Sequence, residues 1–166
     1  MQETQRRWLL KALREAADEM VEELYDLGPT AETHHTGDDE PSLPEIAAHL
    51  CAAEELALAQ LQHLVSRRAT PLPVQEVESP PTAASANSLH TLLRAFLRAR
   101  RRTCMLLWQL TPAQWQQQGL HPYRGSITVG QLARALAEHD LEHLWQIRNY
   151  KKALATDAGQ ADEPPV

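Results

Sequence analysis

The chain has 166 residues, of which 43% are hydrophobic and 23% are charged, a composition typical of one soluble globular domain with its own core. No apolar run approaches the ~18 residues of a transmembrane helix. The charged, amphipathic start of the chain offers no secretory signal, so we expect a cytoplasmic protein. The formal net charge of -6 argues against a nucleic-acid-binding domain, because such domains are usually basic overall.

Cys51 and Cys104 stand alone in the sequence, in no CxxC or repeated pattern. Isolated cysteines of this kind indicate neither a disulfide framework nor a thiolate zinc site. We therefore expect both to be small buried hydrophobic residues.

The charge is unevenly distributed along the chain. No Asp or Glu occurs between Ser79 and Ala137. The same segment contains seven arginines: Arg94, Arg98, Arg100, Arg101, Arg102, Arg124 and Arg134. We expect this basic segment to pack beside the acidic first helix or a partner subunit. A nucleic-acid face and a site for a small anionic substrate are the alternatives.

Apolar spacing and capping signals predict two long helices in the first half of the chain. The first spans about residues 3–27 and ends at the Gly-Pro pair that follows. A polar loop leads to Ser42, where the sequence SLPE forms a capping box with Glu45 and starts the second helix. This helix continues to about Ser66.

The second half begins with residues 69–87, which contain four prolines and predict an extended connection. A third helix is predicted over about residues 88–110. A short helix capped by Thr111 and a loop, QGLHPYRGSI, follow it. A second capping box, Thr128 with Gln131, starts a fourth long helix that ends near Leu154. Residues 155–166 are expected to be a frayed acidic tail.

The long connection determines the expected topology. A helix of about 24 residues is ~36 Å long, and about 19 extended residues can reach ~60 Å. We therefore expect the second and third helices to run parallel, whereas the first and second, and the third and fourth, run antiparallel. Residues 1–154 would then form one all-α domain, a four-helix bundle with a long crossover and a short helix before the fourth.

The stretch HDLEH contains two histidines, His139 and His143, about 40° apart on the fourth helix. Both share the sector of the apolar residues and therefore face the core. His49, in the sequence IAAHL, faces inward from the second helix in the same way. One divalent ion would satisfy three buried imidazoles, each of which costs about 1–3 kcal/mol if left unpaired. The spacing therefore predicts a metal site of His49, His139 and His143.

Other patterns for metal binding or catalysis are missing from the sequence. The third helix has no acidic residue and no pair of ExxH motifs occurs, which argues against a di-iron bundle. HExxH, a nucleophile elbow, a P-loop and a dinucleotide fingerprint are also absent. His34 and His35 lie in the polar loop, where we expect them to be solvated.

The stretch from Trp115 to Ile147, W-x5-HPYRGSITVGQLARALAEHDLEHLWQI, together with IAAHLCAAEE, resembles the DinB-like (DinB/YfiT) superfamily of four-helix metalloproteins. The resemblance implies the crossover topology, metal ligands at His49, His139 and His143, and frequent homodimerisation. One departure is that PSLPE replaces the Trp often found shortly before the first ligand, which affects the pocket wall and not the ligands.

Three neutral imidazoles leave the charge of a divalent ion uncompensated and at least one coordination position open. Zinc, nickel or iron would fit such a site. A bound water can reach a pKa of ~7 and a bound thiol ionises, so the site predicts either metal-assisted hydrolysis or thiol transfer. The resemblance favours an S-transferase that uses a thiol such as bacillithiol or mycothiol. A non-catalytic, stress-associated metal-binding dimer is the alternative.

Several polar residues near the predicted site are weaker candidates. Arg94, Arg98 or Arg124 could orient the carboxylate of a thiol cosubstrate, and Tyr123 could donate a proton at the pocket mouth. Asp140 and Glu142 flank the ligands and could accept hydrogen bonds from imidazole N–H groups. Their angles on the helix point away from the core, so we expect solvated charges instead.

Overall fold

The computed structural model describes residues 1–25, 27, 31, 40–74 and 88–160. Its long helices are α1 (Glu3–Tyr25), α3 (Leu43–Val65), α5 (Leu89–Gln109) and α7 (Val129–Gln160). A short helix, α6 (Pro112–Trp115), and a two-stranded hairpin lie between α5 and α7. None of the helices in these residues has the length and apolar content to cross a bilayer.

The helices begin where the capping residues predict. Ser42 Oγ accepts a hydrogen bond from the Glu45 N–H, and the Glu45 carboxylate accepts one from the Ser42 N–H at 2.7 Å. Thr128 and Gln131 form the same reciprocal pair before α7. The predicted ends are less accurate, because α7 continues to Gln160, six residues beyond the expected end near Leu154. Residues 161–166 of the predicted tail lie outside the described residues.

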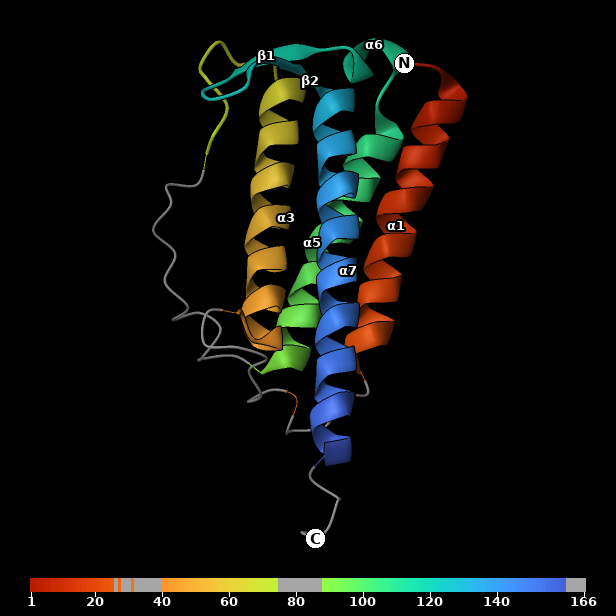
Figure 1. The fold of residues 1–166 in the computed structure, drawn as a ribbon. Helices are drawn as coiled ribbons and strands as arrows, with labels where there is room; N and C mark the ends of the chain where they lie inside the picture. Colours follow the sequence, from red (N-terminus) through yellow and green to blue (C-terminus); the bar gives the residue numbers. More distant parts are fainter. Residues whose placement is uncertain (26, 28–30, 32–39, 75–87, 161–166) are drawn as a thin grey trace, which may run out of the picture.

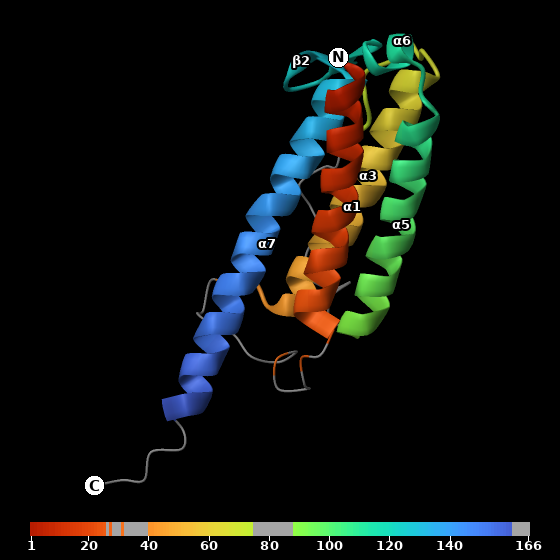
Figure 2. The ribbon, with the colours of Figure 1, turned by 90° about the vertical axis from the view of Figure 1, so that its right-hand side faces the viewer.

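The four long helices form a bundle in which α3 and α5 run one way and α1 and α7 run the other (Figure 1). α3 packs against α5, α1 packs against α7, and contacts between α1 and α5 and between α3 and α7 complete the ring. The parallel pair α3 and α5 confirms the predicted crossover topology. Figure 2 shows that α7 extends past the other helices at its C-terminal end.

A β-hairpin covers one end of the bundle, where the sequence predicted a loop. β1 (Gln118–His121) and β2 (Gly125–Thr128) pair antiparallel. Gly125 has a φ of 71°, a left-handed conformation that glycine adopts without strain. Leu72 donates its N–H to the Leu120 carbonyl at 2.8 Å, so the start of the crossover connection is attached to the hairpin.

The apolar core is divided into two clusters along the bundle axis. One cluster surrounds Met20, Leu50 and Phe96, and the other surrounds Leu13 and Trp115 near the hairpin. All five side chains are at most 2% exposed. Between the two clusters the helices present buried charged groups instead of apolar ones.

This polar layer consists of Arg100 from α5, Glu54 from α3, Asp140 from α7 and the carbonyl of Leu13 from α1. Arg100 donates to Glu54 Oε2 at 2.7 and 2.9 Å, to the two Asp140 oxygens at 2.6 and 2.9 Å, and to Leu13 O at 2.6 Å. The three charged side chains are 0–3% exposed. One guanidinium therefore connects all four long helices.

The burial of Asp140 corrects the expectation that this residue is a solvated charge. The expectation assumed that only a narrow seam of the fourth helix is buried. α7 instead contacts both α1 and α3, so a wider arc of it faces the interior, and Asp140 lies within that arc. Burial raises the pKa of the Asp140 carboxyl, and the hydrogen bonds from Arg100 oppose this shift.

The ion pairs also modify the prediction for the basic segment. α5 does contact α1, but Arg102 pairs with Glu55 of α3 at 3.1 Å. The acidic face of α1 pairs with α7, where Arg148 contacts Glu19 and Glu23. The two arginines of α5 with described ion pairs, Arg100 and Arg102, thus pair with acids of α3 and α7 and not with those of α1.

The sequence analysis predicted that both cysteines are buried. In the structure Cys51 and Cys104 are only partly buried. The Cys51 thiol donates to the Leu92 carbonyl at 3.0 Å, and burial raises its pKa to about 11. Burial also raises the pKa of Cys104. Both are therefore protonated thiols near pH 7, which disfavours a nucleophilic role for either.

Candidate metal centre

Three histidines from two helices converge beside the polar layer. His49 comes from α3, and His139 and His143 come from successive turns of α7. His139 Nε2 lies 3.0 Å from His49 Nε2 and 3.1 Å from His143 Nε2. The three ring centroids are 4.4–5.2 Å apart. The structure thus brings together the three residues that the sequence analysis selected as ligands.

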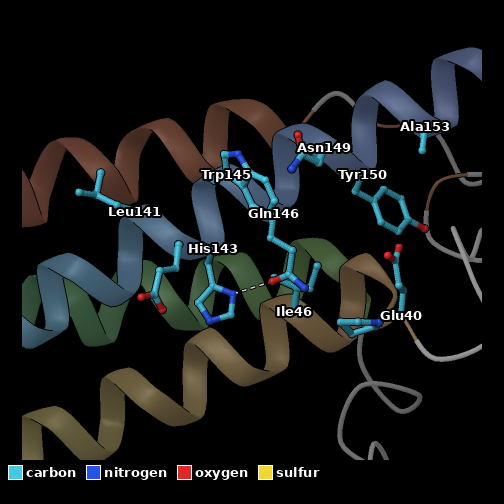
Figure 3. Close-up of a pocket in the computed structure, with 11 residues that line it drawn as sticks. Glu40, Ile46, Leu141, His143, Trp145, Gln146, Asn149, Tyr150 and Ala153 are labelled. Carbon is cyan, nitrogen blue, oxygen red and sulfur yellow. Dashed lines mark hydrogen bonds between the residues drawn. The ribbon is translucent and has the colours of Figure 1, made fainter.

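The ring orientation of His143 is fixed by a neighbour on the same helix. Gln146 Oε1 lies 2.9 Å from His143 Nδ1, as the dashed line in Figure 3 shows. A carbonyl oxygen can only accept, so Nδ1 carries the proton, and in the neutral ring the lone pair of Nε2 then faces the cluster. Metal-binding histidines commonly have such an outer hydrogen-bond partner.

The charge state of the cluster suits metal binding. Burial, together with smaller effects from the charges of His143, His49 and Arg100, lowers the pKa of His139 to about 4. Burial also lowers the pKa of His49, with a smaller effect from His143. Neutral imidazoles are the form that binds metal ions.

Two of the three separations between the ligand nitrogens fit a single ion, and all three nitrogens lie within 4.8 Å of one another. Two nitrogens that each lie about 2.1 Å from one ion are separated by roughly 3.0–3.4 Å, and the two Nε2 distances of 3.0 and 3.1 Å agree with this range. Among the described residues, His49, His139 and His143 are the group of His, Cys, Asp or Glu side chains that lie close enough together to hold a metal ion. No fourth side chain of these types among the described residues belongs to the group.

The cluster lies at the side of the bundle and is open to solvent. His49 is exposed, whereas His139 and His143 are partly buried. A groove of about 970 Å³ reaches His143 and continues along α7 to Ala153 (Figure 3). The start of α3 and the residues before it form the opposite wall, with Ile46 and Glu40. A ligand can therefore approach the histidines from the groove.

The weaker candidates lie elsewhere. Arg94 and Arg98 are exposed on α5, and Tyr123 and Arg124 are exposed at the turn of the hairpin. Of the described residues that line the groove, none is one of these four. Glu142 is exposed, as expected, but it lines the groove next to His143.

The remaining histidines do not belong to this cluster. His63 is buried and bonds the Thr70 carbonyl at 2.8 Å, and His90 makes an edge contact with Tyr25. His121 accepts hydrogen bonds from the N–H groups of the hairpin turn. His34 and His35, predicted to be solvated, lie outside the described residues.

Sequence reasoning missed the groups that support the cluster. Gln146 follows His143 by three residues, a spacing at which two side chains on a helix meet, so this pair could have been found. Glu54 also had a signal, because it is an acid one and a half turns after His49 on an otherwise apolar helix face. Arg100 had none, because six other arginines share its segment.

A crossover four-helix bundle with three histidines beside an open groove defines a class of single-domain helical proteins with a candidate metal site. The model of the DinB superfamily matches residues 5–147, so the chain belongs to the DinB superfamily. This finding confirms the family resemblance. A comparison with curated proteins gives no match.

Two solved structures have a similar fold. YfiT from Bacillus subtilis, described as a probable metal-dependent hydrolase with an unusual four-helix bundle topology, has a TM-score of 0.82 at 13% identity over 93% of this chain and 90% of YfiT. TT2238, described as a four-helix bundle protein, has a TM-score of 0.66 at 19% identity over 87% of this chain and 98% of TT2238. At these identities the likeness concerns the fold.

Proposed function

We propose that this protein is a metal-dependent enzyme whose divalent ion is held by His49, His139 and His143. The observation that carries the proposal is the convergence of three Nε2 atoms, with 3.0 and 3.1 Å separations, beside an open groove. The donor set of three imidazoles suits zinc, nickel or iron. When bound, such an ion supplies a Lewis acid that lowers the pKa of a water or thiol it binds.

Accessibility favours an enzyme over a structural metal protein. Structural zinc sites are closed by four protein ligands, whereas catalytic sites have three and keep a position open. Here the cluster has three side chains within the described residues, His49 is exposed, and the groove passes His143. A non-catalytic metal-binding role would require none of these openings.

Hydrolysis is the reaction that the groove supports best. Ile46, Leu141 and Trp145 give it apolar walls that can hold the organic part of a substrate away from water. YfiT, which shares the fold, is described as a probable metal-dependent hydrolase. No Lys or Arg of the described chain lines the groove to bind the carboxylates of a low-molecular-weight thiol.

Thiol transfer is the second candidate, and the size of the groove favours it. Pockets for single small ligands measure about 300–1,000 Å³, and this groove lies at the upper end at about 970 Å³. It has room for a thiol and an electrophile side by side. In this reaction the thiolate would attack the electrophile and displace its leaving group, with the thiol proton released to solvent.

Metal analysis of the purified protein, followed by two assays, tests the proposal. We expect one divalent ion per chain. Hydrolysis of p-nitrophenyl acetate, or conjugation of monochlorobimane to bacillithiol or mycothiol, should be lost after treatment with a chelator and restored by zinc, nickel or ferrous iron. Protein that carries no ion and acquires none would contradict the metal site. Loaded protein that is inactive in both assays would favour the non-catalytic role.

The hydrogen bond from His143 to Gln146 gives a second prediction. Replacing Gln146 by leucine removes the acceptor that orients the imidazole, and we expect about 10–100-fold weaker metal affinity. Gln146→Glu keeps an acceptor at the same position and should retain most of the affinity. Competition with a chromogenic chelator measures both. Equal affinities of wild type and Gln146→Leu would show that this contact does not support the ligand.

The homodimer and the cytoplasmic location expected from the sequence stay predictions, as does the absence of nucleic-acid binding. Sedimentation in solution measures the oligomeric state directly. A dimer would agree with the expectation, and a monomer at micromolar concentration would contradict it.

A further inference from the structure

A second groove runs between α1 and α5, on the side of the bundle opposite the histidines. The helix contacts give the order α1, α5, α3 and α7 around the bundle, and Figure 2 shows α1 and α5 side by side. The histidines come from α3 and α7. The groove has a volume of about 460 Å³, within the range of about 300–1,000 Å³ for small-ligand pockets. It is therefore separate from the candidate metal centre.

The charged side chains that line this groove are all positive. Arg7, Lys11 and Arg14 line it from α1, at spacings that place neighbouring side chains together on one face of a helix. The α5 wall contributes no acid, because Leu89–Gln109 contains none. By contrast, acidic residues line both the groove at the histidines and the groove between α1 and α7. In a chain with a formal net charge of -6, the groove between α1 and α5 presents a local positive surface.

Two of these cations have acidic partners on the same helix. Arg7 pairs with Glu3 at 2.5 Å, and Lys11 pairs with Glu15 at 3.6 Å. All four side chains are more than half exposed. Exposed pairs of this kind contribute little to stability, so an anionic ligand can compete for these cations at small cost.

The third cation, Arg14, has no described acidic partner. It is exposed, and it takes part in none of the ion pairs between described residues, although Asp18 follows it by one turn. Burial is the largest effect on the pKa of Cys104 and raises it, whereas the charge of Arg14 lowers it. Since Cys104 lines the groove, the guanidinium of Arg14 acts on the groove and is available to a ligand.

Large apolar side chains lie exposed toward the other end of the groove. Trp108 is 74% and Met105 62% exposed, and both line it from α5. Arg100 of α5 donates to the Leu13 carbonyl of α1, and the two helices run in opposite directions (Figure 1). Trp108, two turns after Arg100, therefore lies toward the start of α1. Exposed apolar groups of this size indicate a surface that a ligand covers.

We propose that this groove binds small organic anions, in which a carboxylate, sulfonate or phosphate group is attached to an aromatic body. The anionic group lies at Arg14 and Lys11, and the aromatic body covers Met105 and Trp108. Arginine suits the anionic end, because its planar guanidinium can donate two parallel hydrogen bonds to such a group. The site goes beyond the proposed function, since none of the three candidate metal ligands lines it.

Binding of three probes that share one ring system and differ in charge tests the proposal. The probes are naphthalenesulfonate, naphthalenemethanol and naphthylmethylammonium. We expect naphthalenesulfonate to bind about fivefold or more tightly than the alcohol at low salt, and the ammonium to bind most weakly. The advantage of the sulfonate should shrink at high salt. Ligand-observed NMR measures the affinities. Equal affinities, preference for the cation or no binding of any probe would overturn the proposal.

Variants localise the effect to the groove. Arg14→Gln and Trp108→Leu should each weaken naphthalenesulfonate binding by about threefold or more. Arg134→Gln is the matched control, because it removes the charge of an exposed arginine that lines the groove between α1 and α7, and it should bind like wild type. Full affinity in either groove variant, or an equal loss in Arg134→Gln, would contradict the assignment. Metal analysis and this titration can fail independently, since the two sites share no residue.

Discussion

Replacing His139 by alanine is expected to abolish metal binding and activity while leaving the bundle folded. His139 Nε2 lies close to the ligand nitrogens of both His49 and His143. Its removal leaves only two ligands for the ion and removes the one that lies between them. The loss of affinity should exceed the roughly 10–100-fold that removal of an outer hydrogen-bond partner costs. Metal content after dialysis and the rate of p-nitrophenyl acetate hydrolysis measure the effect.

The structure predicts that this variant does not lose stability in the metal-free state. His139 Nδ1 is buried and has no hydrogen-bond partner in the structure. Substitution by alanine removes this unsatisfied atom, and alanine has a higher helix propensity than histidine. The midpoint of urea unfolding should therefore stay close to that of the metal-free wild type. His90→Ala is the matched control, since His90 is exposed and far from the cluster in sequence. A His139→Ala protein with a full complement of metal would refute the site.

Replacing Arg100 by methionine is expected to destabilise the protein by about 3–5 kcal/mol, the usual effect of removing one partner of a buried ion pair. Methionine fills much of the same volume, but Glu54 and Asp140 would remain 0–1% exposed without their counter-ion. The Leu13 carbonyl would lose its donor as well. Urea unfolding of the metal-free protein, followed by circular dichroism, measures the free energy.

Two further variants separate the charge effect from a loss of packing. Arg102→Met removes an exposed pair with Glu55, whose side chains are 58% and 56% exposed, and should change stability by at most about 1 kcal/mol. Combining Arg100→Met with Glu54→Leu and Asp140→Leu removes all three charges, and most of the lost stability should return. A triple variant no more stable than Arg100→Met would indicate that the packing of Arg100, and not its charge, matters.

The bundle and the ligand set could be predicted because the signals for both are local. The capping residues Ser42 and Thr128 satisfy backbone groups within one turn, so they determine helix starts wherever the helix packs. The partly buried positions of His139 and His143 follow from helical periodicity alone, whereas His49, which was predicted to face inward, is exposed beside them. Their mutual distance additionally required the two helices to be neighbours, and the length of the crossover connection supported that inference.

The hairpin and the polar layer could not be predicted in the same way. Strands of four residues are too short for an alternating pattern to differ from chance, and β1 and β2 are stabilised by pairing with each other and by the Leu72 contact. Whether Asp140 is buried in an ion pair or exposed to solvent depends on which side chain of α5 lies opposite it. That information is not contained in the spacing of residues along one helix.

The guanidinium at the centre of the bundle also determines the axial alignment of its helices. Apolar contacts tolerate a shift of one helix along another, because one leucine can replace the next. A shift of one turn, about 5.4 Å, would carry Glu54 or Asp140 out of reach of Arg100 and leave a carboxylate enclosed without compensation. Asp140 directly follows His139, so the hydrogen bonds of Arg100 that prevent sliding also keep the imidazoles of α3 and α7 at the same level along the bundle axis.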